Sequence, residues 1–499
     1  MVPAISPWAG IAVPLHAVAH PQAPAPAVHF QVTVPANVQA SVPFSVLVEA
    51  ETGSKHVATG YTGTVQISLG TADVGAILPT AYTFSASDHG EHRFQLTLAA
   101  LGRQTIVACN TKTSSLTGSA ATTVNPAPIE SLATDLYAKL SSQPGNLAFS
   151  PFSIETALAM AYAGASGQTA TEMANVLHLG PDTPATHAAL AAMIQQVVAD
   201  GNAAGSTLNT ADALFGQTGY PFSPAYLQLL QGIYDAPLQN VDFQNASEQA
   251  RATINSWVSQ ETQNKIPDLF PDGTINAQTR LVLANAIYFH GSWVNAFDPN
   301  NTNTGSFSVT PADTVQVSLM HQTSDFLYGN KNGVQTLEMP YVGGHLAMDI
   351  LLPDQPDGIG TLSSELTAAN LAQWTSDLSN DSVEVTLPKF QVNTSFSLNS
   401  VLSALGMPDA FNPKTANFSG MTTGPNSLYI SQVVHQAYVN VDETGTEAAA
   451  ATGIGVSTSA VAAFPPPPVV FDADHPFIYV IRDTSTNTIL FMGRVSDPS

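Results

Sequence analysis

With 499 residues, the chain is long enough for two or three domains. Its 13 basic and 37 acidic residues give a formal net charge of −24, which repels phosphate backbones and anionic lipids, so a nucleic acid, a heparin-like polyanion and a membrane are not expected as partners. The single cysteine excludes an intramolecular disulfide, and no apolar run is long enough to span a bilayer.

Residues 1–28 are rich in alanine and proline, which predicts a flexible lead-in. No lysine or arginine precedes Lys55, so the apolar stretch from Ile11 to Ala19 lacks the basic flank of a secretory signal. A signal peptide is therefore not evident in this numbering, and the sequence leaves the export route open.

Residues 29–125 contain short runs in which apolar and polar residues alternate, separated by turn signals. The alternating apolar residues are Val32 and Val34, then Phe44, Val46 and Val48, then Val65, Ile67 and Leu69, then Phe94, Leu96 and Leu98. This spacing predicts an all-β immunoglobulin-like sandwich. The stretch Val57–Val65 also resembles bacterial extracellular Ig-like modules, so we expect a spacer or adhesion module in a secreted, extracellular or cell-envelope protein. Cys109 follows Ile106–Ala108 and is expected to be a small core residue on a strand rather than a reactive thiol.

A stiff, extended linker, Asn125–Pro128, separates this module from the rest of the chain. The pattern then becomes helical, with Ile129, Leu132, Leu136 and Leu140 on one face, and a later helix holds Ile254, Trp257 and Val258. Helical segments come first and strand-like segments dominate later. Residues 126–499 are therefore predicted to form one large α+β domain.

The chain contains none of the motifs G-x-S-x-G, H-E-x-x-H and G-x-x-x-x-G-K-[ST]. The histidine pairs at positions 89 and 92 and at positions 16 and 20 have no acidic or cysteine ligand nearby in a predicted helix, so no metal and no other cofactor is expected. A Ser-His-Asp trio could assemble in space, but the sequence selects none. We therefore do not expect an enzyme.

A helix is predicted to begin at Ser150 and Pro151, because serine is a favoured N-cap and proline a favoured first helical residue. The string Asn146–Ile154, continued by Ala157–Met160, closely resembles the second helix of the serpin family. Further matches follow in the family's order: Leu283–Phe289 with Gly291–Trp293, Leu387–Phe390, Leu405–Met407, Ala416–Gly420, His475–Phe477 and Phe491–Val495. The second domain is therefore identified as similar to serpins, which are serine protease inhibitors, and specifically to serpins of the bacterial type.

The resemblance implies the serpin fold: a large central β-sheet, further sheets, about eight or nine helices and an exposed reactive loop. It implies that Ser150, Ser153, Asn285 and His435 form a polar cluster under the middle of the main sheet, where the central strands part. Trp293 matches an aromatic residue near the top of the sheet, where loop insertion begins. Taken singly, these residues would suggest a capped helix, a satisfied core histidine and a core tryptophan. With the family match, we expect all five to control opening of the sheet.

The segment 441–453 resembles the hinge of inhibitory serpins. Its hinge residues are Gly445, Thr446, Glu447, Ala448, Ala449, Ala450, Ala451 and Thr452. Every second residue from Thr446 to Thr458 is small, apolar or β-branched and the other face is polar or small, which predicts a strand with one buried face. Thr446 itself is expected near the surface before insertion. The glycines at 453 and 455 and the run Pro465–Pro468 suit a strand poorly, so a flexible linker remains an alternative.

The family spacing from Gly445 implies a scissile bond between Ser459 and Ala460. Counting back from Phe471 gives Ala462 or Ala463 instead, and Phe464 is a further candidate. All of these except Phe464 are small, which favours elastase-like or subtilisin-like proteases, and the absence of a basic candidate disfavours a trypsin-like target.

The implied function is inhibition of a serine-type endopeptidase by a suicide-substrate mechanism. The protease attacks the loop, forms a covalent acyl-enzyme, and is trapped when the cut loop inserts into the main sheet as a new strand. We expect a monomer whose partner is the target serine protease. The alternative is a non-inhibitory serpin-fold binding or carrier module.

Overall fold

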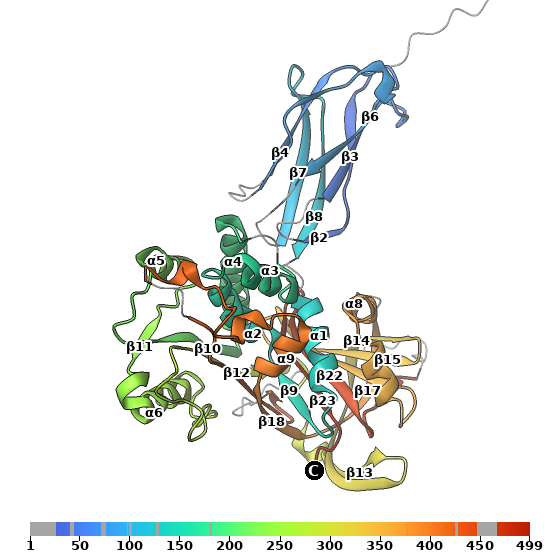
Figure 1. Ribbon diagram of the computed structural model, residues 1–499. Helices are drawn as coiled ribbons and strands as arrows, with labels where there is room; N and C mark the ends of the chain where they lie inside the picture. Colours follow the sequence, from blue (N-terminus) through green and yellow to red (C-terminus); the bar gives the residue numbers. More distant parts are fainter. Residues whose placement is uncertain are drawn as a thin grey trace, which may run out of the picture.

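The computed structural model describes residues 26–39, 44–70, 76–96, 98, 102–125, 129–179, 182–376, 378–424, 428–446 and 467–499. Figure 1 shows the described strands of the N-terminal quarter as one elongated body and the remaining elements as a second, larger body.

The described residues of the N-terminal body form strands and one short 3-10 turn. The strands are β1 (His29–Thr33), β2 (Asn37–Gln39), β3 (Phe44–Glu51), β4 (Thr64–Leu69), β5 (Tyr82–Thr83), β6 (Glu91–Leu96), β7 (Gly102–Asn110) and β8 (Thr117–Asn125). They form a three-stranded sheet in the order β1-β3-β6 and a five-stranded sheet in the order β2-β8-β7-β4-β5. Alternate apolar residues of both sheets, such as Val46, Val65 and Phe94, share one core, as the alternation in the sequence predicts.

Cys109 lies on a strand, β7, but the expectation that it is a core residue is wrong. Ile106 and Ala108 are fully buried, whereas Cys109 is half-buried. Successive side chains of a strand point to opposite faces, so burial of Ala108 turns the neighbouring thiol away from the core.

In the larger body, nine α-helices lie in the described residues. They are α1 (Ile129–Leu140), α2 (Pro151–Tyr162), α3 (Gly167–Val176), α4 (Pro184–Gly201), α5 (Pro224–Ile233), α6 (Phe243–Glu261), α7 (Ile359–Glu365), α8 (Ala368–Ser376) and α9 (Asn399–Leu405). The four apolar residues that predicted the first helix are all buried on α1, and Ile254, Trp257 and Val258 lie on α6 as predicted. None of the described helices combines the length and the apolar character that a membrane span requires.

The strands of the larger body form two sheets. They are β9 (Leu147–Phe149), β10 (Ser206–Gln217), β11 (Gln239–Val241), β12 (Leu281–Ser292), β13 (Asn303–Thr310), β14 (Asp313–Lys331), β15 (Val334–Pro340), β16 (Leu346–Pro353), β17 (Ser379–Pro388), β18 (Phe390–Ser397), β19 (Gln432–Val441), β20 (Gly445–Thr446), β21 (Val469–Asp472), β22 (Phe477–Asp483) and β23 (Ile489–Val495). The main sheet has the order β11-β10-β12-β20-β19-β18, and the second sheet runs β21-β17-β14-β15-β16-β22-β23-β9, with β13 paired to β14.

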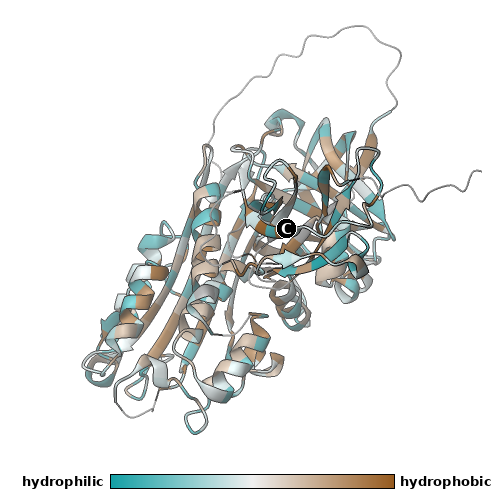
Figure 2. Cartoon of the chain, turned by 90° about the horizontal axis from the view of Figure 1, so that it is seen from above, coloured by the Kyte–Doolittle hydropathy of each residue, from teal (hydrophilic) through white to brown (hydrophobic). Residues whose placement is uncertain are grey.

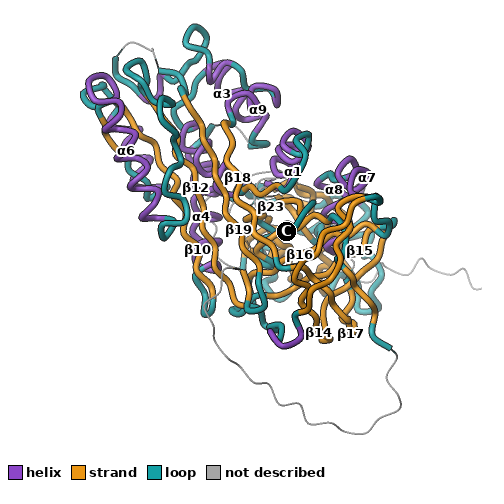
Figure 3. The backbone as a smooth tube through the Cα atoms, turned by 90° about the horizontal axis from the view of Figure 1, so that it is seen from below, coloured by secondary structure: helices purple, strands orange, loops and turns teal. Residues whose placement is uncertain are grey.

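The central strands of the main sheet are apolar on both faces because both faces are covered. On β12, Val282, Ala284 and Ala286 pack with α6, whereas Leu283 and Ile287 belong to the core on the side of α2. A strand that is buried on both faces has a nearly continuous apolar sequence. Figure 3 shows β10, β12, β19 and β18 side by side, with α6 along one edge of the view, and Figure 2 shows many hydrophobic residues along these strands.

Candidate functional site: the gate and the hinge of the main sheet

The first residues of α2 lie beneath the main sheet, where the sequence places them. Ser150 is the N-cap of α2, and its Oγ accepts a hydrogen bond from the backbone N–H of Ser153 at 3.1 Å. Pro151 follows as the first helical residue. Both serines are fully buried, and α2 contacts β10 and β12 of the main sheet and β23 of the second sheet. The helix therefore presents its capped end to the underside of the central strands.

The seam between β12 and β19 carries the other two predicted polar residues. The two strands pair in parallel, with Asn285 directly beside His435. The backbone N–H of Ser150 donates to Nε2 of His435 at 2.9 Å, so this nitrogen carries no proton. The proton of the neutral ring is then on Nδ1, which donates to Oδ1 of Asn285. Burial lowers the pKa of His435 to about 3, consistent with a neutral imidazole.

Asp212 on β10 belongs to the same cluster, and the sequence analysis missed it. The hydroxyl of Ser153 and the amide Nδ2 of Asn285 each donate to Oδ1 of Asp212 at 2.6 Å. The Asn285 amide also donates to the hydroxyl of Ser153 at 2.6 Å. A signal was present in the sequence, because Asp212 is an acidic residue inside the apolar run Ala211–Phe215, and buried carboxyl groups usually have partners. We call Ser150, Ser153, Asp212, Asn285 and His435 the gate cluster.

Trp293 lies apart from the gate cluster, at the end of β12. Its ring stacks on Tyr341 with centroids 4.5 Å apart, and its Nε1 donates to the carbonyl oxygen of Asp442 at 3.1 Å. Its backbone N–H donates to the carbonyl oxygen of Thr444 at 3.0 Å. Trp293 therefore holds the chain just before β20, the strand that begins the predicted hinge.

The hinge enters the main sheet through Gly445. Ser292 on β12 is paired with Gly445, and Gly291 is paired with Thr446, which also pairs with Val441 on β19. Gly445 has a φ of +157°, and a Cβ atom at this position would lie 2.0 Å from the carbonyl oxygen of Gly291. No side chain fits there, which explains why glycine occupies the position.

The expectation that Thr446 lies near the surface is wrong. Thr446 is only 1% exposed, and its hydroxyl is 2.5 Å from the hydroxyl of Tyr341. The reason is that β20 already fills the space between β12 and β19 above the seam, so the first two hinge residues are strand residues before any cut. Alternation shows which face of a strand is apolar, but it does not show where pairing begins.

An ion pair between half-exposed Lys389 and buried Glu443 fixes the turn before β20. Lys389 Nζ lies 2.8 Å from Oε2 of Glu443, and Thr302 Oγ1 donates to Oε1 at 2.8 Å. Partial burial opposes ionisation of Glu443, yet the hydrogen bonds from Lys389 and Thr302 leave its pKa below the usual range. Lys389 belongs to a string that pointed to the family, but nothing in the sequence alone identified its partner.

The remaining predicted residues lie outside the described part of the chain. These are the hinge residues Glu447, Ala448, Ala449, Ala450, Ala451 and Thr452, and the cleavage candidates Ser459, Ala460, Ala462, Ala463 and Phe464. The linker prolines 126 and 128 and residues 1–25 of the lead-in also lie outside it.

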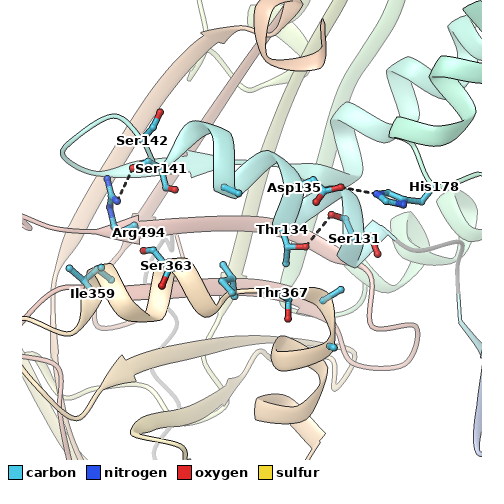
Figure 4. Close-up of a pocket in the computed structure, with 16 residues that line it drawn as sticks. Ser131, Thr134, Asp135, Ser141, Ser142, His178, Ile359, Ser363, Thr367 and Arg494 are labelled. Carbon is cyan, nitrogen blue, oxygen red and sulfur yellow. Dashed lines mark hydrogen bonds and ion pairs between the residues drawn. The ribbon is translucent and has the colours of Figure 1, made fainter. Parts of the chain in front are cut away.

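A hollow of about 790 Å³ lies away from the gate cluster, between α1, α7 and the start of α8 (Figure 4). Its labelled lining is mostly hydroxylic, including Ser131, Thr134, Ser363 and Thr367, with an ion pair of 2.8 Å between His178 and Asp135 at one side. In the part of the chain with described coordinates, no three histidine, cysteine or acidic side chains gather so that they could hold a metal ion.

Residues 127–498 match the model of the family described as serpin (serine protease inhibitor). Leukocyte elastase inhibitor A of Rattus norvegicus is 42% identical over 366 residues, covering 72% of this chain and 94% of the relative. The match to the family begins after the N-terminal two-sheet body, so it does not bear on that body.

Solved structures also resemble this chain. Serpin48, described as a highly specific serpin in the insect Tenebrio molitor, superposes with a TM-score of 0.67 at 31% identity, covering 74% of this chain and 97% of its own. Human thyroxine-binding globulin in complex with its hormone superposes with a TM-score of 0.66 at 28% identity, covering 75% and 98% of the two chains. These relatives, from mammals and an insect, do not test whether the chain is of the bacterial type.

Proposed function

Because this chain belongs to the serpin family of serine protease inhibitors, we propose that it traps its target by inserting the loop that follows Thr446 between β12 and β19. The main observation in support is that β20 already pairs with both strands at the entry to that space. The loop thus has a paired starting point from which further residues can add to the sheet, the mode known as strand addition.

The gate cluster supports this route because its hydrogen bonds cross the seam that must part. The bond between Asn285 and His435 joins β12 to β19, and the bond from Ser150 fixes His435 to α2. We propose that Ser150, Ser153, Asn285 and His435 set the resistance of the seam and that Trp293 holds the entry. They control opening and take no part in covalent chemistry.

An elastase-like target fits both the loop sequence and the name of one relative. The rat relative carries the name of an elastase inhibitor, and the candidate residues Ser459, Ala460, Ala462 and Ala463 are small. A subtilisin-like protease, which also accepts small residues, is the second member of the proposed target class. We propose that the complex with the protease is a covalent acyl-enzyme and that the free inhibitor is a monomer.

The test is a denaturing gel of the protein after incubation with pancreatic elastase. We expect a new band at the summed mass of inhibitor and protease. A cut chain with no such band would show substrate behaviour and would reject trapping of this enzyme class. Mass spectrometry of the released C-terminal fragment identifies the scissile bond among the candidates.

The carrier alternative draws little support from the described residues. Small-molecule sites are mostly lined by apolar and aromatic side chains, whereas the hollow beside α1 mixes serine and threonine with small aliphatic residues and has no phenylalanine, tyrosine or tryptophan in its lining. This hollow therefore lacks the aromatic lining that is common in small-molecule sites. The same gel decides between the two functions, because a pure carrier forms no covalent complex.

We further propose that residues 29–125 form an immunoglobulin-like spacer and that the protein is secreted to the outside or to the cell envelope. The two sheets and their shared core support the sandwich, and the resemblance of Val57–Val65 to extracellular modules supports the location. Treating intact producing cells and their medium with an added protease tests the location. A chain protected until the cells are broken would reject it.

A further inference from the structure

Asp212 occupies a position in the gate cluster where the protein keeps a carboxyl group without a basic partner. It lies directly beside Asn285 in the pairing of β10 with β12. Its Oδ1 accepts two hydrogen bonds, from Ser153 and Asn285. Its Oδ2 is buried and meets no hydrogen-bond donor among the described residues. The residue as a whole is half-buried, but desolvation acts on the oxygen atoms, so their burial decides the cost of a charge.

The hydrogen bonds of Asp212 orient the whole cluster. Because the Asn285 amide nitrogen donates to Asp212 and Ser153, the amide oxygen must face the other way, toward His435. That oxygen accepts a hydrogen bond from Nδ1–H of His435, and Nε2 is left to accept a hydrogen bond from the backbone N–H of Ser150. Asp212 therefore acts on the seam through Asn285, although it lies one strand away from it.

Resting on the proposed function, we propose that Asp212 is a positioning residue of the gate whose carboxyl keeps the seam closed while it carries a proton and loosens the seam when it loses that proton. Parting of β12 from β19 frees the Asn285 amide and admits water beside Asp212. An ionised carboxylate gains solvation in that open state, and a neutral carboxyl gains little. Ionisation thus favours opening.

The pKa of Asp212 supports this direction. Burial raises it to about 8, and the hydrogen bonds from Ser153 and Asn285 offset only part of the effect of burial. The gate then changes charge within the range in which many secreted proteases work, so opening becomes easier as the pH rises from 6 to 9.

Other titratable groups lie on the elements packed around Asp212. They are Glu155 and Tyr162 on α2, His187 and Asp200 on α4, Tyr288 and His290 on β12, His435 and Tyr438 on β19, and Glu248, Arg251 and Glu261 on α6. His435 shares the hydrogen-bonded cluster but stays neutral down to about pH 3 because burial lowers its pKa. Glu155 is the competing candidate, since it is fully buried and burial raises its pKa to about 8.

Hydrogen exchange of the uncut protein, without any protease, tests the proposal. The readout is the opening constant of the amides at 282–287 and 433–437, which is the observed exchange rate divided by the intrinsic rate at each pH. In the native chain we expect this constant to rise by about tenfold between pH 6 and pH 9, since a tenfold change corresponds to about one unit of pKa difference between closed and open states. In Asp212→Asn, which keeps the shape of the neutral carboxyl, we expect less than a twofold change.

Glu155→Gln is the matched control and should keep the native rise. A flat profile in the native chain overturns the proposal without any variant, and so does a native rise that persists in Asp212→Asn. If Glu155→Gln removes the rise instead, the titrating carboxyl is that of Glu155, and the proposal for Asp212 is overturned as well. Because no protease is present, failure of elastase trapping leaves this measurement unaffected.

Discussion

Asn285 and His435 form a side-chain hydrogen bond across the seam between β12 and β19. Both residues are fully buried, so the bond is shielded from bulk solvent while the seam is closed. The contact is therefore part of the resistance that an inserting strand must overcome.

Asn285→Ala is expected to destabilise the uncut protein by about 2 kcal/mol or more, because the buried N–H of His435 loses its acceptor and the buried oxygens of Ser153 and Asp212 lose the amide donor. The thermal midpoint should fall by a few degrees. Calorimetry of the uncut chain measures it, with Asn240→Ala, an exposed asparagine on β11, as the control. Equal midpoints for the two variants would mean that the contact contributes nothing to the closed sheet.

The two titratable members of the gate cluster should give opposite pH dependences. His435 is protonated in the unfolded chain below about pH 6.5 but in the folded chain only near pH 3, so its contribution to stability is complete above pH 6.5 and is lost as the pH falls. Asp212 keeps its proton in the folded chain up to about pH 8 but loses it near pH 3.8 when unfolded, so its contribution is complete below pH 3.8 and is lost as the pH rises toward 8.

Between pH 4.5 and 6.5 the two slopes oppose each other, each with an upper limit of about 1.4 kcal/mol per pH unit. Relative to the native chain, His435→Gln should become less stable as the pH rises through this window, and Asp212→Asn should become more stable. The midpoints of urea unfolding at four pH values test this prediction. Subtracting the profile of the native chain removes the contributions of the other carboxyl groups. If both variants show the same dependence of stability on pH as the native chain, neither His435 nor Asp212 has the shifted pKa that burial predicts.

Ala448→Arg should convert the inhibitor into a substrate. Alternation places Ala448 on the same face as Thr446, which in β20 already points into the buried side beside Tyr341. An arginine that must enter the sheet there without a partner meets a penalty of several kcal/mol, and about 3 kcal/mol slows insertion by more than a hundredfold. The number of inhibitor molecules consumed per protease inactivated measures the effect.

Glu447→Arg is the control, since this residue belongs to the opposite face and already carries a charged side chain. Similar stoichiometries for the two variants would contradict the assigned face. Thr446→Arg is not a suitable test, because Thr446 is buried before the cut and its replacement should lower the thermal midpoint of the uncut chain.

Cutting the loop near Ser459 should raise the thermal midpoint by tens of degrees. Each backbone hydrogen bond formed on insertion contributes about 1 kcal/mol net, so about ten new bonds amount to much of the 5–15 kcal/mol that holds a typical fold. Scanning calorimetry before and after the cut, with mass spectrometry to prove the cut, gives the answer. An unchanged midpoint would speak decisively against insertion.

Removing residues 1–128 should leave the rate of protease inactivation within about twofold. Among the described residues, the two-sheet body has its own core, to which the larger domain adds only the buried Ala189, and the gate cluster and the hinge lie from Ser150 onward. A chain that begins at Ile129 is compared with the full chain in the same elastase assay. A loss greater than about tenfold would mean that the N-terminal body shapes the inhibitory site.

Much of the site could be predicted because its residues lie in strings with local structural reasons. Ser150 and Pro151 are a favoured cap and first turn, and the structure confirms the cap by the bond from the Ser153 amide. The alternating strands of residues 29–125 and the helix from Ile129 to Leu140 were likewise found from periodicity. The family resemblance then brought Asn285 and His435 together, which no local pattern could do.

The errors and omissions have a common physical origin in pairing between distant segments. Thr446 was expected at the surface because alternation carries no information on whether β20 already lies between β12 and β19. Asp212 was missed because its role depends on Ser153 and Asn285, which are 59 and 73 residues away in the chain. The stacking of Tyr341 on Trp293 and the pair between Lys389 and Glu443 were missed for the same reason.

Strand direction at the top of the main sheet decides how often one molecule can act. β12 and β19 run parallel to each other, whereas β20 runs antiparallel to both. A strand that continues from β20 exchanges one parallel ladder for two antiparallel ladders, which are the more stable pairing. Such an exchange does not reverse on its own, so each chain can inhibit only once. The amount of protease that can be inhibited is therefore limited by the number of intact chains, because one chain does not act repeatedly.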